Sequence, residues 1–106
     1  MTTNSTDAIQ ALGDPTRRAI LERLLAGPLP VKDIAASLPV SRPAVSQHLR
    51  VLKDAGLVSE QARGTLRIYR LKPSGLVGIR TYVDNFWTAA LAQFAEAAGH
   101  DRGRAR

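Results

Sequence analysis

Two polar residues, Ser46 and Gln47, lie in the middle of a segment that otherwise follows the pattern of an amphipathic helix. The segment 41–58 reads SRPAVSQHLRVLKDAGLV. A glutamine side chain can pair bidentately with adenine, and a serine hydroxyl can hydrogen-bond to either type of base. Long cationic side chains at the flanks of such a face can reach backbone phosphates. This face therefore has the chemistry needed to read a nucleic acid.

Neighbouring residues extend this candidate DNA-binding face. Arg42 could read guanine or hold a phosphate, and Pro43 offers an apolar surface suited to a thymine methyl group. Arg50 and Lys53, one or two turns further along, are better placed for phosphates. The candidate DNA-binding residues are Ser41, Arg42, Pro43, Ser46, Gln47, His48, Arg50, Lys53, Arg63 and Arg67.

These residues also have interpretations that involve no ligand. Ser46 and Gln47 could form a solvated helix face, and Arg50 and Lys53 could be surface charges. His48 could contact DNA or help to pack the turn, and packing is slightly favoured. The residue types alone do not decide between these interpretations.

The distribution of charge favours a polyanionic partner. The net charge of the chain is +6, and residues 41–72 hold seven basic and two acidic side chains, whereas residues 1–40 are balanced. Positive charge clustered in this way is expected of a protein that binds nucleic acid. A basic face that only aids solubility is the alternative.

Composition limits the other possibilities. A chain of 106 residues with 44% apolar residues fits one globular domain, and the absence of cysteine excludes disulfides and thiolate metal sites. We expect neither a signal peptide nor a membrane span, and we expect a cytoplasmic location. Catalytic residues, a cofactor and a metal site are not expected either, since no acid pair, activated nucleophile or phosphate-cradling glycine loop is visible.

Hydrophobic periodicity predicts helices followed by a hairpin and one long helix. Asp14 and Ser41 have the residue types of helix N-caps, and Gly56 that of a C-terminal stop. Val45, Leu49 and Leu52 form a stripe at helical spacing. The predicted helices are 6–12, 14–26, 31–38, 41–55 and 74–98, and the predicted strand-like runs are 57–62 and 66–72.

This order predicts a mainly α fold with a two-stranded β-hairpin (α+β), in which four helices precede the hairpin and one follows it. Two successive helices with a polar-faced second member suggest a helix-turn-helix, and a basic hairpin after it makes a winged helix. We expect one domain over residues 1–106, with an ordered core at 6–98 and flexible ends at 1–5 and 99–106. The recognition helix would be 41–55 and the wing 57–71.

The chain resembles the ArsR-type winged-helix transcriptional regulators over about residues 8–98. The passages that carry the resemblance are ALGDPTRRAILERLLAG and LPVSRPAVSQHLRVLKDAGLVSEQARGTLRIYRLKPSGL. The resemblance implies that 41–55 is the recognition helix, with contacts at Arg42, Pro43, Ser46 and Gln47. It also implies a homodimer, built mainly from the first and last helices, that represses transcription at an inverted-repeat operator and often controls its own promoter.

The long helix supports a dimer independently, because its apolar stripe is broader than one small domain needs. An intramolecular core is the alternative, in part, for Val83 and Phe86. The candidate interface residues are Ile9, Leu12, Tyr82, Phe86, Trp87, Ala90, Leu91 and Phe94.

The sequence departs from relatives that sense metals. It has only two histidines, His48 and His100, and the pair Glu96 and His100 is better explained as solvated surface than as a metal site. The aromatic pair Phe86 and Trp87 is typical of a metal-independent branch. Lys72 stands where relatives often have a capping acid, so the last helix could begin later, from Ser74.

We therefore expect a sequence-specific, homodimeric repressor that binds double-stranded DNA and carries no cofactor. One alternative is a small-molecule sensor with a pocket at the dimer interface, near Trp87. An unidentified small molecule or partner protein is a possible effector of the repressor itself. Two further alternatives are a winged helix that binds an acidic protein and an architectural protein that binds DNA without sequence preference.

Overall fold

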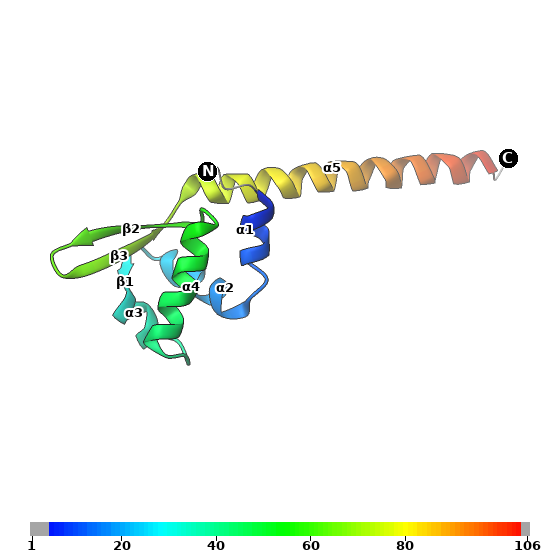
Figure 1. Ribbon diagram of the computed structural model, residues 1–106. Helices are drawn as coiled ribbons and strands as arrows, with labels where there is room; N and C mark the ends of the chain where they lie inside the picture. Colours follow the sequence, from blue (N-terminus) through cyan, green and yellow to red (C-terminus); the bar gives the residue numbers. More distant parts are fainter. Residues whose placement is uncertain (1–4, 105–106) are drawn as a thin grey trace.

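The computed structural model describes residues 5–104, with side chains from residue 7 to residue 99. The predicted mainly α fold with a hairpin is confirmed (Figure 1). The elements are α1 (Ser5–Ala11), α2 (Pro15–Leu24), β1 (Leu29–Pro30), α3 (Val31–Ala36), α4 (Arg42–Asp54), β2 (Val58–Arg63), β3 (Leu66–Leu71) and α5 (Pro73–Arg104).

The sheet has three strands where the sequence predicts two. Its order is β1-β3-β2, and both pairings are antiparallel. β1 contains only Leu29 and Pro30, which is too short to show an alternating pattern. Pro30 lacks an N–H group and so fits an edge strand. In the hairpin, Arg63 pairs with Leu66, so the turn between β2 and β3 is the two residues Gly64 and Thr65.

The beginning of α2 is tied firmly to α1. The Asp14 carboxylate accepts hydrogen bonds from the backbone N–H groups of Thr16 (2.7 Å) and Arg17 (3.1 Å), which confirms its predicted role as an N-cap. Arg17 Nε donates to the carbonyl oxygen of Ala11, and Arg18 Nη1 donates to that of Leu12, both at 2.6 Å. The two arginines therefore satisfy carbonyl groups at the end of α1 that have no partner within that helix.

One hydrophobic core joins the first four helices to the sheet. Its fully buried side chains, with under 2% of their surface exposed, come from α2, α3, α4, the start of β2 and the residue before it. Ala8 and Ala11 bring α1 into the same cluster, and Ile79 of α5 packs against it. The large fully buried residues are Ile20, Ile34, Val45, Leu49, Leu52, Leu57 and Val58.

Helix α5 extends away from this core (Figure 1). The molecule measures 72 × 30 × 22 Å, and its radius of gyration of 19.2 Å exceeds the roughly 13 Å of a compact domain of this length. The helix is longer than the predicted span 74–98 and continues through Arg104. Among the described residues, no helix is long and apolar enough to cross a membrane.

Helix α5 begins one residue earlier than Ser74, at Pro73, a residue type that is favoured in the first helical turn. The missing capping acid is replaced by backbone contacts at Lys72. Its carbonyl oxygen accepts from the N–H groups of Gly75 (3.1 Å) and Leu76 (3.4 Å), and its own N–H donates to the Leu57 carbonyl oxygen at 2.9 Å. The start of α5 is thus fixed to the residues that follow α4.

A second contact at this junction requires a glycine. Gly56 ends α4 with a φ of 78°, as predicted. A Cβ atom on Gly75 would lie 2.0 Å from the carbonyl oxygen of Gly56 and 2.8 Å from its carbonyl carbon. The backbone of α5 therefore approaches the turn after α4 more closely than any other residue type would permit. We call these contacts of Gly56, Leu57, Lys72 and Gly75 the α4–α5 junction.

The junction predicts opposite effects of the same substitution at two glycines of α5. Gly75→Ala should lower the free energy of unfolding by about 1–3 kcal/mol, because the methyl group collides with backbone. Gly99→Ala is the control, since nothing lies within 4 Å of its Cβ position. It should raise helix stability by up to about 1 kcal/mol. Chemical denaturation measures both, and a Gly75→Ala protein as stable as the wild type would contradict the close approach.

Candidate nucleic-acid interface

The rotation of α4 about its axis is fixed by its buried stripe. Val45, Leu49 and Leu52 are 0% exposed, and this burial confirms the stripe predicted from their spacing. The Ser41 hydroxyl accepts a hydrogen bond from the Ala44 N–H at 3.2 Å and so caps the helix. The predicted DNA-binding residue Ser41 therefore has a structural role at the start of α4.

The opposite face of α4 is open to solvent. The exposed candidates from the sequence are Arg42, Pro43, Ser46, Gln47, Arg50, Lys53, Arg63 and Arg67. His48 differs from them, because it is half-buried. The hydrogen bond from the Arg17 backbone N–H is the main cause of the lowered pKa of Asp14, and the proximity of His48 is a smaller one. This position agrees with the packing interpretation of His48.

A groove of about 630 Å³ separates α4 from the wing. Ser46, Gln47, Arg50 and Lys53 line its α4 side. The residues that complete the lining are Val31, Asp54, Glu60, Arg67 and Tyr69. The groove thus brings together the polar face of the helix and one face of the sheet, as the winged-helix prediction requires.

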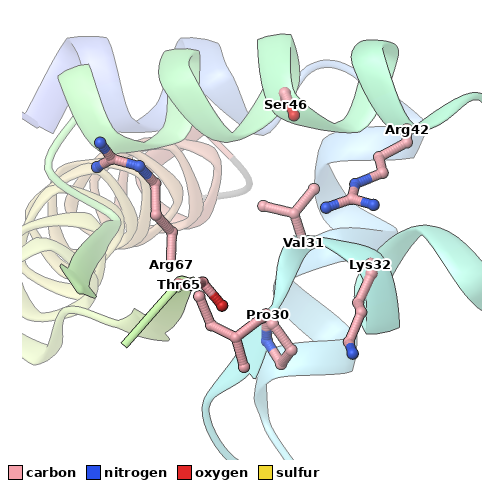
Figure 2. Close-up of a pocket in the computed structure, with 8 residues that line it drawn as sticks. Pro30, Val31, Lys32, Arg42, Ser46, Thr65 and Arg67 are labelled. Carbon is pink, nitrogen blue, oxygen red and sulfur yellow. The ribbon is translucent and has the colours of Figure 1, made fainter. Parts of the chain in front are cut away.

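A smaller cleft of about 280 Å³ borders the groove at Ser46 and Arg67. Figure 2 shows Arg42 and Ser46 on α4 facing Thr65 and Arg67 of the wing across this cleft. Lys32 of α3 also lines it, although neither its position in the chain nor its spacing marks it as a candidate. Three cationic side chains from three elements therefore surround the cleft.

The two wing arginines face in different directions. Side chains alternate between the faces of a strand, and the register pairs Ala62 with Arg67 and Arg63 with Leu66. Arg67 therefore shares the face of Glu60 that is turned to α4, whereas Arg63 lies on the other face. The sequence places both near the hairpin tip but does not distinguish their directions.

Glu60 of β2 connects the wing to α4. Its Oε1 atom accepts from Lys53 Nζ at 2.6 Å, and its Oε2 atom accepts from Arg67 Nη1 at 3.2 Å. The Tyr69 hydroxyl lies close enough to this carboxylate to help lower its pKa. The side chain of Glu60 is 17% exposed, whereas those of Lys53 and Arg67 are 48% and 67% exposed. A mostly buried carboxylate therefore holds two cations that remain accessible to solvent.

These contacts shift the pKa values of Glu60 and Tyr69. The hydrogen bond from Lys53, followed by that from Tyr69, lowers the pKa of Glu60 to about 2. Burial, together with the neighbouring Glu60 carboxylate, raises the pKa of Tyr69 to about 12. At neutral pH the carboxylate is therefore ionised and the phenol is a neutral donor.

Glu60 and Tyr69 were not among the candidates from the sequence, although the register could have identified them. A two-residue turn at Gly64 and Thr65 places Glu60 opposite Tyr69 by counting back along the strands. The contact with Lys53 could not be counted in this way, because it depends on how the hairpin packs against α4. In the charge balance of residues 41–72, Glu60 is only one of two acidic residues among seven basic ones.

The apolar stripe of α5 is uncovered in the single chain. Phe86 is 68% exposed, Phe94 64%, Trp87 58%, Leu91 47% and Tyr82 46%. Val83 is 52% exposed, so the alternative of an intramolecular core is wrong for Val83 and Phe86. The remaining interface candidates are half-buried, namely Ile9, Leu12 and Ala90. The side chain of His100, considered with Glu96 as a metal pair, lies outside the described residues.

The chain is similar in sequence to known regulators of transcription. A family model described as bacterial regulatory protein, arsR family, matches residues 14–60, from the N-cap of α2 to Glu60. The HTH-type transcriptional regulator Rv2034 of Mycobacterium tuberculosis is 60% identical over 89 residues, which are 84% of this chain and 83% of that protein. The transcriptional repressor SdpR of Bacillus subtilis is 35% identical over 80 residues, 76% of this chain and 89% of that protein.

A solved structure has a fold similar to that of this chain. The homodimeric winged helix-turn-helix DNA-binding domain of a possible ArsR-family regulator from Mycobacterium bovis matches with a TM-score of 0.63 and 28% identity. The match covers 80% of this chain and 77% of that chain. The two chains therefore share one fold.

The lowered pKa of Glu60 predicts how its contribution to stability depends on pH. A carboxyl group whose pKa is lowered by folding stabilises the protein above its ordinary pKa of 4.5, and this stabilisation is lost as the pH falls toward about 2. Glu60→Gln should therefore lower the free energy of unfolding at neutral pH, by about 1–3 kcal/mol. The difference from the wild type should shrink between pH 4.5 and 2. Urea denaturation at several pH values measures it, and a difference independent of pH would contradict the proposed ionisation.

Proposed function

The chain belongs to the ArsR family of bacterial regulatory proteins, and we propose that it acts as a homodimeric repressor of an inverted-repeat operator. As a member of this family it is a winged helix-turn-helix regulator of transcription and not an enzyme. The observation that carries the proposal is the exposed polar face of α4 across a groove from a basic wing. A repressor acts where bacterial DNA lies, in the cytoplasm.

In this proposal α4 lies in the major groove of DNA. Ser46 and Gln47 lie at the centre of its exposed face, where short polar side chains can reach base edges. Arg42 and Pro43 contact bases near the start of the helix, and Arg50 contacts a phosphate. A helix held by a fully buried stripe supports this role, because direct reading of bases requires a constant orientation of the reading face.

The wing contacts the DNA beside α4. Arg67 lies on the wing face turned to α4 and lines both the groove and the cleft, so it is suited to the backbone next to the major groove. Arg63 lies on the other face and can reach the neighbouring minor groove. Lys32 at the cleft is a further candidate for a phosphate contact.

A second copy of the chain would cover the apolar stripe of α5. Large apolar side chains that are half or more exposed along one helix are unfavourable in water, and burial of such a face is a common basis of obligate dimers. The similar domain from Mycobacterium bovis is described as homodimeric, which supports assembly as a dimer. A two-fold dimer would place its two α4 helices about 34 Å apart, one turn of DNA.

The relative named as a transcriptional repressor supports repression as the direction of regulation. We propose that the protein represses its own promoter, as the resemblance in the sequence implies. The first DNA to examine is therefore the region upstream of its own gene.

The proposal predicts a preference for that upstream DNA over a shuffled duplex of the same length. The preference should be about 10³-fold or more at fixed salt. Gln47→Ala should weaken binding to the upstream DNA by about 1–3 kcal/mol while leaving binding to the shuffled duplex nearly unchanged. Fluorescence anisotropy titrations measure both affinities.

Gln61→Ala is the matched control for this experiment. Gln61 is a second exposed glutamine, on the wing face turned away from α4, where its Oε1 atom accepts from Arg70 Nη2 at 3.2 Å. The control should retain the preference. Equal binding of the wild type to both duplexes would contradict repression of its own promoter. Equal losses in the two variants would contradict the reading role of Gln47.

A further inference from the structure

We infer that Glu60 is a positioning residue that fixes Lys53 and Arg67 as one phosphate-binding pair and thereby raises the sequence specificity of DNA binding. The inference rests on the proposed function, and it assigns a role to an acidic residue in an otherwise basic surface. Glu60 itself need not touch DNA, since it is largely covered and each of its carboxylate oxygens already accepts from a cation.

Geometry supports the pairing of the two cations. Lys53 is in the last turns of α4, and Arg67 is on β3, so the two side chains come from elements that are separate in the chain. Each oxygen atom of the Glu60 carboxylate binds one of them, at 2.6 Å and 3.2 Å. Because both cations also line the groove between α4 and the wing, they are held at the same place in it.

Both cations keep donors for a phosphate. Glu60 engages Nη1 of Arg67, and the Nε and Nη2 atoms of a guanidinium carry further N–H groups. Lys53 likewise has three N–H groups on Nζ, and both side chains are about half exposed or more. A phosphodiester oxygen in the groove could therefore accept from both while they remain bound to Glu60.

The hold of Glu60 on Lys53 and Arg67 affects binding to specific and to non-specific DNA differently. A long cationic side chain that is free to move can follow the phosphates of any sequence, so it contributes to non-specific binding. A cation held in place favours only the complex in which a phosphate lies at that place, and it loses less conformational freedom on binding. Glu60 also removes one positive charge from the surface, which lowers attraction to DNA in general. Both effects raise the ratio of specific to non-specific affinity.

Two substitutions of Glu60 test separately how the charge of the carboxylate and its position affect DNA binding. Glu60→Gln keeps the shape of the side chain and removes the charge. Glu60→Asp keeps the charge and shortens the side chain by one methylene group, which draws its oxygen atoms away from the positions where they bind the two cations. Glu22→Gln is the control, because Glu22 is an exposed residue of α2 whose substitution changes the net charge by the same amount.

The experiment uses the duplex that the wild-type protein enriches most from a random-sequence library, with a shuffled duplex beside it. Affinities for both are measured over a range of salt concentrations, at protein concentrations where unfolding curves show every variant to be folded. Glu60→Gln and Glu60→Asp should each lower the ratio of specific to shuffled affinity by about tenfold. Binding to the shuffled duplex should not weaken, and Glu22→Gln should retain the wild-type ratio.

Each other outcome has a distinct meaning. An unchanged ratio in Glu60→Asp would overturn the positioning role, as would equal losses of affinity on the two duplexes in Glu60→Gln. A ratio lowered to the same extent by Glu22→Gln would overturn it too, because net charge alone would then account for the effect. If the wild type enriches no sequence, the proposed function fails first and the inference fails with it.

Discussion

The burial of three side chains on α4 determines which residues of this helix face the solvent. Val45, Leu49 and Leu52 have no exposed surface, so α4 cannot rotate without opening the core. Ser46 and Gln47 occupy the opposite face as a direct consequence. The capping hydroxyl of Ser41 and the turn at Gly56 fix where this face begins and ends.

The residues after α4 connect this face to the other exposed surfaces. The wing returns to α4 through Glu60 and Lys53, and α5 starts at the α4–α5 junction, where Lys72 binds Leu57 and Gly75 packs against Gly56. The proposed DNA-binding face and the proposed dimer helix therefore share one rigid region. A movement of α5 in a dimer would be transmitted to the end of α4 through backbone contacts, which have little freedom to adjust.

The sequence predicts most of the fold because its helices carry strong local signals. The N-caps Asp14 and Ser41, the stripe on α4 and the stop at Gly56 all depend on residues within a few positions of one another. Strand β1 is missed because two residues show no alternation, and the full length of α5 is missed because an exposed helix has no packing contact to mark its end.

The candidate site is predicted less completely, because its contacts cross between elements. Spacing along α4 identifies Ser46, Gln47 and Arg50 as exposed, but it cannot show that His48 lies near Asp14. The role of Glu60 depends on the hairpin register and on the docking of the wing against α4. Charge counting alone treats such a residue as an unfavourable feature of a DNA-binding surface, whereas the geometry makes it part of the site.

The central claim is that α4 reads DNA from a two-fold dimer held by α5. Hydroxyl-radical footprinting of the enriched duplex tests it most directly. The account predicts two protected half-sites centred about 10–10.5 base pairs apart, or a multiple of that. It also predicts that this pattern is lost in Phe94→Glu but kept in Asn85→Glu, an exposed position on the opposite side of α5. A single protected half-site for the wild type, or an unchanged footprint for Phe94→Glu, would contradict the account.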